Sequence, residues 1–265
     1  MTDPEDALPP GLDEALAGAA RAERLIVACD FDGTLSPIVD DHEAAAADPR
    51  ALEPLAALVS LPHTEVVVIS GRARSDLEPR LRSLPPEVAL IGSHGAEPPE
   101  GSSEPHPEVE RYASALDDLV REVPGVRLER KPFSLALHYR GVVASRQASV
   151  RSSALERLAA TGAAVKEGKK VVEFLAVRAD KGGALVRYRD EVARRNGAAQ
   201  VVTLFVGDDV TDEAAFERLT PPDVSVKVGS GATAAAHALE RREEVAALLE
   251  RLRRLRADAT TGRDS

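Results

Sequence analysis

The stretch Leu25-Ile26-Val27-Ala28-Cys29-Asp30-Phe31-Asp32-Gly33-Thr34 joins an unbroken apolar run to two carboxylates and a glycine. An apolar run without alternation is typical of a strand buried on both faces, as in a parallel sheet with helices above and below. In open α/β sheets the ligand crevice lies beyond the carboxyl ends of the strands, where Asp30 and Asp32 fall. The stretch therefore predicts an α/β fold with its functional site at this strand end.

The two carboxylates predict a metal ion and phosphate chemistry. Asp30 and Asp32 are two residues apart, so their side chains project the same way from an extended segment. They repel each other unless a cation lies between them or one is protonated, and a hard cation such as Mg²⁺ meets the first condition. An ionised Asp beside it can attack phosphorus, while its neighbour protonates the leaving oxygen and later activates water. The alternative is an acidic turn, because Asp and Gly are common in turns.

Length and composition exclude several classes of protein. The chain has 265 residues, 43% of them hydrophobic, which is enough for one large domain or two modest ones. Its formal net charge of −10 argues against general binding to nucleic acid or anionic membranes. The single cysteine, Cys29, excludes a disulfide framework. Because the first ten residues lack signal-peptide features and no apolar run reaches membrane-spanning length, we expect a cytoplasmic enzyme.

Polar residues also follow two further unbroken strands. The strand predicted over residues 65–69 ends at Ser70-Gly71-Arg72, and the one over residues 201–206 ends at Gly207-Asp208-Asp209. The Ser70 hydroxyl can donate a hydrogen bond to a phosphate oxygen, although an ordinary βα turn is the alternative. Lys181 opens a predicted helix. One parallel sheet would bring a nucleophile, an acid/base, a phosphate donor, a cation and metal-binding carboxylates to one crevice.

A change of composition predicts a second domain. Residues 98–107 are rich in proline, glycine, serine and glutamate, which is typical of a linker. Beyond it, residues 133–140 alternate between apolar and polar side chains, which indicates a sheet with one packed face and one wet face. We predict a core formed by residues 1–100 and 179–265, and a smaller inserted α+β cap domain over residues 101–178.

Charged residues are expected on the wet face of the small sheet. Glu129 and Lys131 share a face by the two-residue period, and so do Lys169 and Glu173. Because Glu accepts hydrogen bonds and Lys donates them, paired acids and bases suit the binding of several sugar hydroxyls. The alternative is ordinary ion pairing at the surface.

In this order the motifs resemble the haloacid dehalogenase (HAD) superfamily of phosphatases, and the resemblance covers both core segments. It implies a Rossmann-like core with a parallel sheet, and Thr34 resembles the phosphatase version of the first motif rather than that of a mutase. It also implies Mg²⁺ bound by Asp30, the backbone carbonyl of Asp32 and Asp208, with Asp209 beside them. The implied nucleophile, acid/base and two phosphate-holding residues are, in that order, Asp30, Asp32, Ser70 and Lys181.

Four further segments are similar to trehalose-6-phosphate phosphatases across nearly the whole chain. They are Gly92-Ser93-His94-Gly95-Ala96-Glu97, Glu129-Arg130-Lys131 leading to His138-Tyr139-Arg140, Gly168-Lys169-Lys170-Val171-Val172-Glu173, and Gly207-Asp208-Asp209-Val210-Thr211-Asp212-Glu213. The resemblance implies hydrolysis of trehalose 6-phosphate through an aspartyl-phosphate, with the cap binding the disaccharide. The residues implied to contact the substrate are Thr34, Gly71, Arg72, His94, Glu129, Lys131, His138, Lys169 and Glu173.

Two other interpretations keep the HAD fold and a sugar-phosphate ligand but change the function. The first is a HAD phosphatase for another sugar phosphate, such as sucrose 6-phosphate or a phosphorylated glycosyl-glycerate. The second is a catalytically silent sugar-phosphate sensor or a regulatory subunit of a synthase, although every catalytic position of the matched motifs is filled. Since no glycosyltransferase sequence precedes the motifs, we expect a partner trehalose-phosphate synthase to be a separate chain.

Overall fold

The computed structural model describes residues 8–39, 41–99 and 106–261. The chain divides into two compact units, one formed by Met1–Pro99 and Asp180–Ser265, the other by Glu100–Ala179. We call them the core unit and the cap unit. The predicted domain limits, at residues 100 and 178, differ from this division by one residue at each side.

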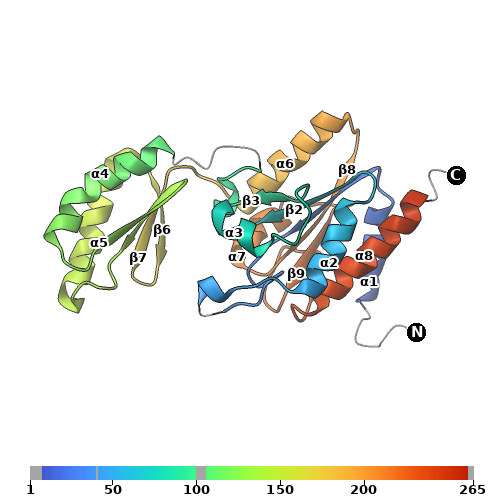
Figure 1. Ribbon diagram of the computed structural model, residues 1–265, viewed down its shortest axis with the longest axis horizontal. Helices are drawn as coiled ribbons and strands as arrows, with labels where there is room; N and C mark the ends of the chain where they lie inside the picture. Colours follow the sequence, from blue (N-terminus) through green and yellow to red (C-terminus); the bar gives the residue numbers. More distant parts are fainter. Residues whose placement is uncertain (1–7, 40, 100–105, 262–265) are drawn as a thin grey trace. The chain divides into compact units, whose positions relative to one another are not determined.

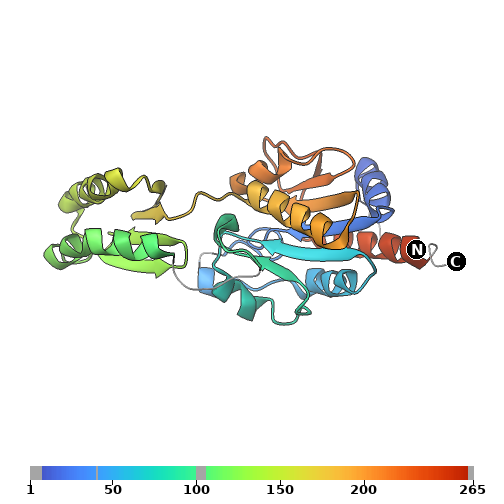
Figure 2. The same ribbon diagram turned by 90° about the horizontal axis from the view of Figure 1, so that it is seen from above.

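The core unit is built on a six-stranded sheet in the order β10-β9-β8-β1-β2-β3, in which every pair is parallel. The apolar run of residues 25–29 lies in β1, which pairs with β2 on one side and β8 on the other (Figures 1 and 2). The predicted α/β fold with a parallel sheet is confirmed. The strands are β1 (Arg24–Cys29), β2 (Thr64–Ile69), β3 (Ala89–Ile91), β8 (Val201–Gly207), β9 (Val224–Val228) and β10 (His237–Leu239).

Helices cover both faces of this sheet because the strands are apolar on both sides. Successive side chains of a strand point to opposite faces, so Val27 packs into one hydrophobic cluster and Ile26 into another. The first cluster receives α1 (Pro10–Ala20), α2 (Pro49–Val59), α3 (Arg74–Arg80) and α8 (Glu244–Thr261), and the second receives α6 (Lys181–Asn196) and α7 (Val210–Phe216). Two short 3₁₀ helices, η2 (His42–Ala44) and η3 (Ser93–Gly95), complete the described core unit.

The cap unit has a four-stranded antiparallel sheet in the order β4-β5-β7-β6. The alternation predicted one packed face and one wet face, and the structure agrees. Leu135 and Leu137 are buried under two helices, while the opposite face carries polar side chains. The elements are α4 (Pro107–Glu122), β4 (Arg127–Lys131), β5 (Ser134–His138), α5 (Ala144–Leu158), η4 (Ala159–Thr161), β6 (Ala164–Gly168) and β7 (Val171–Leu175).

Neither unit contains a membrane-spanning element among the residues that the structure describes. No helix in that part of the chain combines the length and the apolar composition needed to cross a bilayer. Cys29 is a free and buried thiol at the end of β1, and burial raises its pKa to about 12. This cysteine therefore belongs to the packed core.

Candidate active site

Asp30 lies directly after β1, and its carboxylate is buried against Lys181 in the first turn of α6. The Lys181 Nζ atom is 2.7 Å from Asp30 Oδ1 and 2.7 Å from Asp212 Oδ1. The side chains of Asp30 and Lys181 are only 4% and 3% exposed. The helix begins here because the Asp180 side chain accepts a hydrogen bond of 2.8 Å from the backbone N–H of Gly183. Lys181 is thus a fixed cation between two carboxylates.

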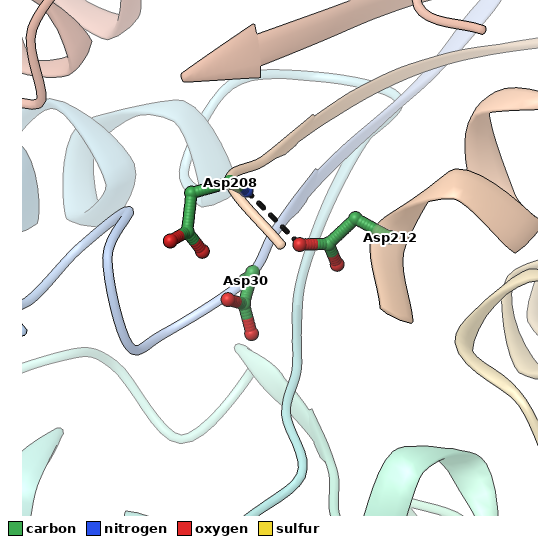
Figure 3. Close-up of side chains that lie close together, drawn as sticks. All are labelled: Asp30, Asp208 and Asp212. Atoms are coloured by element: carbon green, nitrogen blue, oxygen red, sulfur yellow. Dashed lines mark hydrogen bonds between the residues drawn. The ribbon is translucent and has the colours of Figure 1, made fainter. Parts of the chain in front are cut away.

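Three carboxylates meet at this point, those of Asp30, Asp208 and Asp212 (Figure 3). One oxygen of each lies within 4.8 Å of the others. Asp212 is oriented by the backbone N–H groups of Asp208 and Asp209, which both donate to its Oδ2 at 3.0 Å. Gly33 adopts a φ of +83°, and a Cβ there would lie 1.9 Å from Asp208 Oδ2. Only glycine therefore allows the Asp208 carboxylate to come this close to the loop that follows Asp30.

The electrostatics of the group favour a bound cation. Burial raises the pKa of Asp30 well above its usual range, Lys181 opposes this and Asp212 adds to it. Burial also raises the pKa of Asp208, and the Asp212 charge acts in the same direction. Burial alone would lower the pKa of Lys181, but the carboxylates of Asp30 and Asp212 raise it above its usual value. Asp208 Oδ1 is buried without a hydrogen-bond partner among the described residues. Three carboxylates sharing one ammonium group fit a hard divalent cation with oxygen ligands.

Asp209, which the sequence prediction places beside the metal, has a different position. It is the N-cap of α7, and its Oδ1 accepts a hydrogen bond of 2.6 Å from the backbone N–H of Val210. Asp212, at the third position of the same helix, completes a capping box with it and turns its carboxylate toward Asp30. The third carboxylate of the group is therefore that of Asp212.

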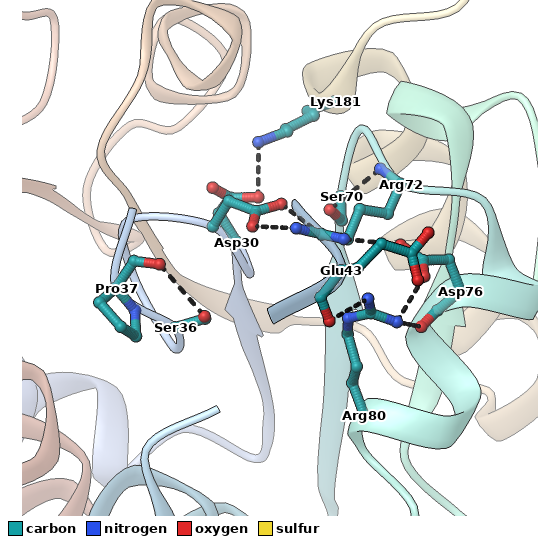
Figure 4. A network of polar contacts seen from close by, with 10 residues as sticks. Asp30, Ser36, Pro37, Glu43, Ser70, Arg72, Asp76, Arg80 and Lys181 are labelled. Carbon is teal, nitrogen blue, oxygen red and sulfur yellow. Dashed lines mark hydrogen bonds and ion pairs between the residues drawn. The ribbon is translucent and has the colours of Figure 1, made fainter. Parts of the chain in front are cut away.

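Asp32 and Arg72 form an ion pair that the sequence did not predict. Arg72 Nε lies 2.7 Å from Asp32 Oδ2, and Arg72 Nη2 lies 2.7 Å from Asp32 Oδ1. The structure thus brings Arg72, a predicted substrate contact, together with Asp32, a predicted catalytic residue. Ser70, directly after β2, is 1% exposed, and its Oγ accepts a hydrogen bond of 3.2 Å from the backbone N–H of Arg72 (Figure 4).

His94, Gly71 and Thr34 lie around the same loops. The His94 ring packs on Gly71, where a Cβ would lie 2.5 Å from the ring, and the His94 backbone N–H donates to the Ser70 carbonyl at 2.8 Å. His94 therefore fixes the loop that carries Ser70. Thr34 is fully buried, and within the described residues its Oγ1 has no hydrogen-bond partner.

The polar face of the cap sheet carries two bonded groups. Lys131 Nζ donates to Glu173 Oε1 at 3.0 Å, and Ser134 Oγ donates to the same oxygen at 2.6 Å. Burial would raise the pKa of Glu173, but Ser134 and Lys131 together lower it below its usual value. In the second group His138 Nε2 lies 2.7 Å from Glu129 Oε2. Four of the predicted sugar-binding residues thus share this face.

Lys169 does not occupy the strand position that the two-residue period gave it. It lies in the two-residue turn between β6 and β7, where Lys170 has a φ of +68° and β7 begins at Val171. The lysine on the polar face in register with Glu173 is Lys166 of β6. The period failed here because a hairpin turn interrupts the alternation of the strand.

Sequence reasoning also gave no role to Ser134 or Lys227. Lys227 of β9 is 8% exposed, and its ammonium group donates to the backbone carbonyl of Asp208 and, at 2.9 Å, to that of Val228. A lysine inside the apolar stretch of residues 224–228 was the available signal, because a charge is rarely buried without partners. Ser134 gave no such signal, since a serine is common on a wet strand face.

Residues 28–243 match the model of the trehalose-phosphatase family. The chain belongs to the trehalose-phosphatase family. The trehalose-phosphate phosphatases of Mycobacterium tuberculosis (strain ATCC 25618 / H37Rv) and Mycobacterium leprae (strain TN) are 34% and 33% identical to this family member over 263 and 250 residues. The alignments cover 92% and 86% of this chain, but 66% and 57% of those proteins, so the chain spans less than two thirds of either relative.

Solved structures of trehalose-6-phosphate phosphatases have the same fold as this trehalose-phosphatase family member. That of Aspergillus fumigatus in crystal form 3 matches with a TM-score of 0.70 and 26% identity, over 94% of this chain and 98% of that one. The C-terminal domain of the Candida albicans enzyme matches with a TM-score of 0.64 and 24% identity, over 91% and 96% of the two chains. The second likeness concerns the fold alone. The HAD fold predicted from the motifs is confirmed.

Proposed function

We propose that this chain hydrolyses trehalose 6-phosphate to trehalose and phosphate. The observation that carries the proposal is the buried pair of Asp30 and Lys181 beside two further carboxylates, in a chain of the trehalose-phosphatase family. A carboxylate fixed against a cation at the end of a parallel strand is placed to act as a nucleophile, because the cation favours its ionised form.

The reaction proceeds in two displacements. An Asp30 oxygen attacks phosphorus, the bond from phosphorus to the sugar oxygen breaks, and Asp32 gives that oxygen its proton. Water then attacks the aspartyl-phosphate, Asp32 takes a proton from the water, and Asp30 is released with free phosphate. Lys181 offsets the charge of the phosphoryl oxygens, and Ser70 donates a hydrogen bond to one of them.

Asp30, Asp208 and Asp212, with the backbone carbonyl of Asp32, would hold Mg²⁺. The ion would offset negative charge on the transferring group, as a hard cation with oxygen ligands does in phosphoryl transfer. Fixing those ligands is the work of the protein: Gly33 makes room for Asp208, and two backbone N–H groups orient Asp212.

The cap unit supplies the sugar contacts of the proposed substrate. Glu173, Glu129 and Lys131 present acceptors and donors on one face of its sheet, a combination that suits a disaccharide with many hydroxyls. We place Lys169 among these contacts as well, from the hairpin turn. A separate trehalose-phosphate synthase would supply the substrate, and the cytoplasm is the expected compartment.

Phosphate release from a panel of sugar phosphates tests this function. With Mg²⁺ present, trehalose 6-phosphate should be hydrolysed in strong preference to sucrose 6-phosphate and glucose 6-phosphate. Equal rates across the panel would leave the core chemistry standing and reject the sugar assignment. Binding of trehalose 6-phosphate without any phosphate release would favour a sensor instead.

Replacing the nucleophile tests the mechanism. We expect Asp30→Asn to lower kcat by at least ~10⁴-fold, because the amide cannot form the aspartyl-phosphate. Circular dichroism should show an unchanged fold, and Asp41→Asn, an exposed acid of the same unit, serves as the control. Appreciable turnover by Asp30→Asn would remove Asp30 from the role of nucleophile.

A further inference from the structure

Arg72 is bonded in a way that leaves little of it for a substrate. Its Nε and Nη2 atoms bind the two oxygens of Asp32, and its Nη1 atom donates to Asp76 Oδ2 at 2.7 Å. Its side chain is only 8% exposed, and its guanidinium lies 5.5 Å from the centre of the Phe31 ring. All three guanidinium nitrogens therefore already bind carboxylates.

The contacts of Arg72 continue into α3 and away from the site. Asp76 also binds Arg80, whose Nη1 donates to the Asp76 carboxylate and, at 2.9 Å, to the Asp76 backbone carbonyl. Arg80 Nη2 donates in turn to the backbone carbonyl of Glu43 at 3.1 Å. Figure 4 shows Arg72, Asp76, Arg80 and Glu43 following one another in this order. Asp76 thus fixes the Arg72 guanidinium on the side away from Asp32, and Arg80 in turn fixes Asp76.

Asp32 by itself has little to fix it. Its side chain is 35% exposed and follows a strand end, so without a partner its carboxylate would rotate freely. A fork with two parallel N–H···O bonds fixes both the position and the plane of a carboxylate, which a point charge does not. We propose that Arg72 is a positioning residue that orients Asp32 for proton transfer, with Asp76 orienting Arg72.

This inference rests on the proposed function, in which Asp32 gives a proton to the leaving sugar oxygen and later takes one from water. Both transfers require the carboxylate within hydrogen-bond reach of the reacting oxygen. A residue that acts only through Asp32 should lose its effect when Asp32 is disabled. A residue that holds the substrate should keep its effect in that background.

A double-mutant cycle separates these two cases. We expect Arg72→Lys, which keeps the charge and loses the fork, to lower kcat for trehalose 6-phosphate on the order of 100-fold. In the Asp32→Asn background the same substitution should change kcat by less than about 3-fold, because coupled residues are not additive. Asp76→Asn should act in the same direction with a smaller loss. The control is Glu78→Gln, which removes an exposed ion pair with Arg74 on the same helix and should leave kcat unchanged.

A binding measurement that needs no turnover completes the test. In the Asp30→Asn background, adding Arg72→Lys should leave the Kd for trehalose 6-phosphate within about 3-fold, as measured by calorimetry. Equal losses of kcat with and without Asp32, or a tenfold weaker Kd, would overturn the inference and return Arg72 to the substrate contacts. Absence of phosphate release by the unmodified chain would instead reject the proposed function and the inference with it.

Discussion

At the scale of single residues, the core site depends on which acidic side chain turns inward. The sequence predicted Asp30 and Lys181, because one ends an unbroken strand and the other begins a helix. It did not distinguish Asp209 from Asp212, because both follow β8 within one short stretch. Only the geometry of α7 makes Asp209 its N-cap and Asp212 the partner of Lys181.

The ion pair of Asp32 and Arg72 could not be predicted from the sequence either, since it joins the ends of two different strands.

Lys227 should affect metal affinity through the backbone of Asp208. The N–H of Asp208 is bound by Asp212 and its carbonyl by Lys227, so both main-chain groups are fixed. We expect Lys227→Met to weaken Mg²⁺ binding roughly 10-fold, a loss typical when support of a metal ligand is removed, as measured by calorimetry. Ser225→Ala, on the same face of β9, is the control. An unchanged Kd would show that Asp208 keeps its position without Lys227.

At the scale of elements, apolar patterns predicted most strands and helices but not their exact ends. Unbroken runs predicted β1, β2 and β8, and alternation predicted β5. The edge strand β10 was missed, because the three residues His237-Ala238-Leu239 carry no period that a pattern could detect. Lys169 was misplaced because the position of a hairpin turn depends on backbone conformation as well as on the pattern.

Asp48, the N-cap residue of α2, should make the unfolding free energy of the core unit depend on pH. Asp48 accepts a hydrogen bond of 3.0 Å from the backbone N–H of Arg50. Its bonds to the Arg50 side chain lower its pKa to about 2, although burial acts in the opposite direction. We expect Asp48→Ala to cost about 1 kcal/mol in unfolding free energy at pH 7. Because the pKa is lower in the folded state, this contribution is present above about pH 4 and lost as pH falls through 2.

Urea unfolding of the unmodified chain and of Asp48→Ala between pH 7 and pH 2.5 measures the difference in their unfolding free energies. Glu87→Ala, which replaces an exposed acid in the turn before β3, is the control. The stability gap between the unmodified chain and Asp48→Ala should narrow toward acid pH. A difference in unfolding free energy that stays constant with pH would mean that the ionised carboxylate of Asp48 does not stabilise α2.

In the cap sheet, Ser134 should contribute to substrate affinity by holding Glu173. Its hydroxyl donates to Glu173 Oε1 at 2.6 Å, beside the Lys131 bond to the same oxygen. We expect Ser134→Ala to raise KM for trehalose 6-phosphate about 5-fold with little change in kcat, because the change affects a binding group and no reacting atom. Steady-state kinetics beside Ser149→Ala, an exposed serine of α5, measures it. A fall in kcat at constant KM would contradict this assignment.

At the scale of the whole molecule, one buried arginine ties the last helix to the first part of the chain. Arg256 of α8 is fully buried, and its side chain donates five hydrogen bonds to other residues in the described part of the chain. They run to the Thr64 hydroxyl and to the backbone carbonyls of Ala20, Ala22, Pro62 and His63. These bonds join the end of α1 to the segment before β2, where the His63 carbonyl also accepts a hydrogen bond of 3.0 Å from the backbone N–H of Leu25.

Removing this arginine should destabilise the core unit. We expect Arg256→Met to lower the unfolding free energy by about 3 kcal/mol, since the hydrogen bonds of a buried guanidinium are lost while the side-chain volume is nearly kept. Urea denaturation measures the change. Arg254→Met, an exposed position on the same helix, should alter stability by less than about 0.5 kcal/mol. Similar losses for both variants would show that the buried network is dispensable.

The insertion of the cap unit between β3 and α6 also affects how the chain is synthesised. β1 pairs with β2, which follows soon after it, but its other neighbour is β8, which is made only after the entire cap. During translation the backbone N–H and C=O groups along one edge of β1 therefore remain without their β8 partners until the cap unit has been synthesised. The loop after β1 that begins at Asp30 meets Asp208 only at that late stage, so a nascent chain that ends within the cap unit carries the first motif without the carboxylates of Asp208 and Asp212.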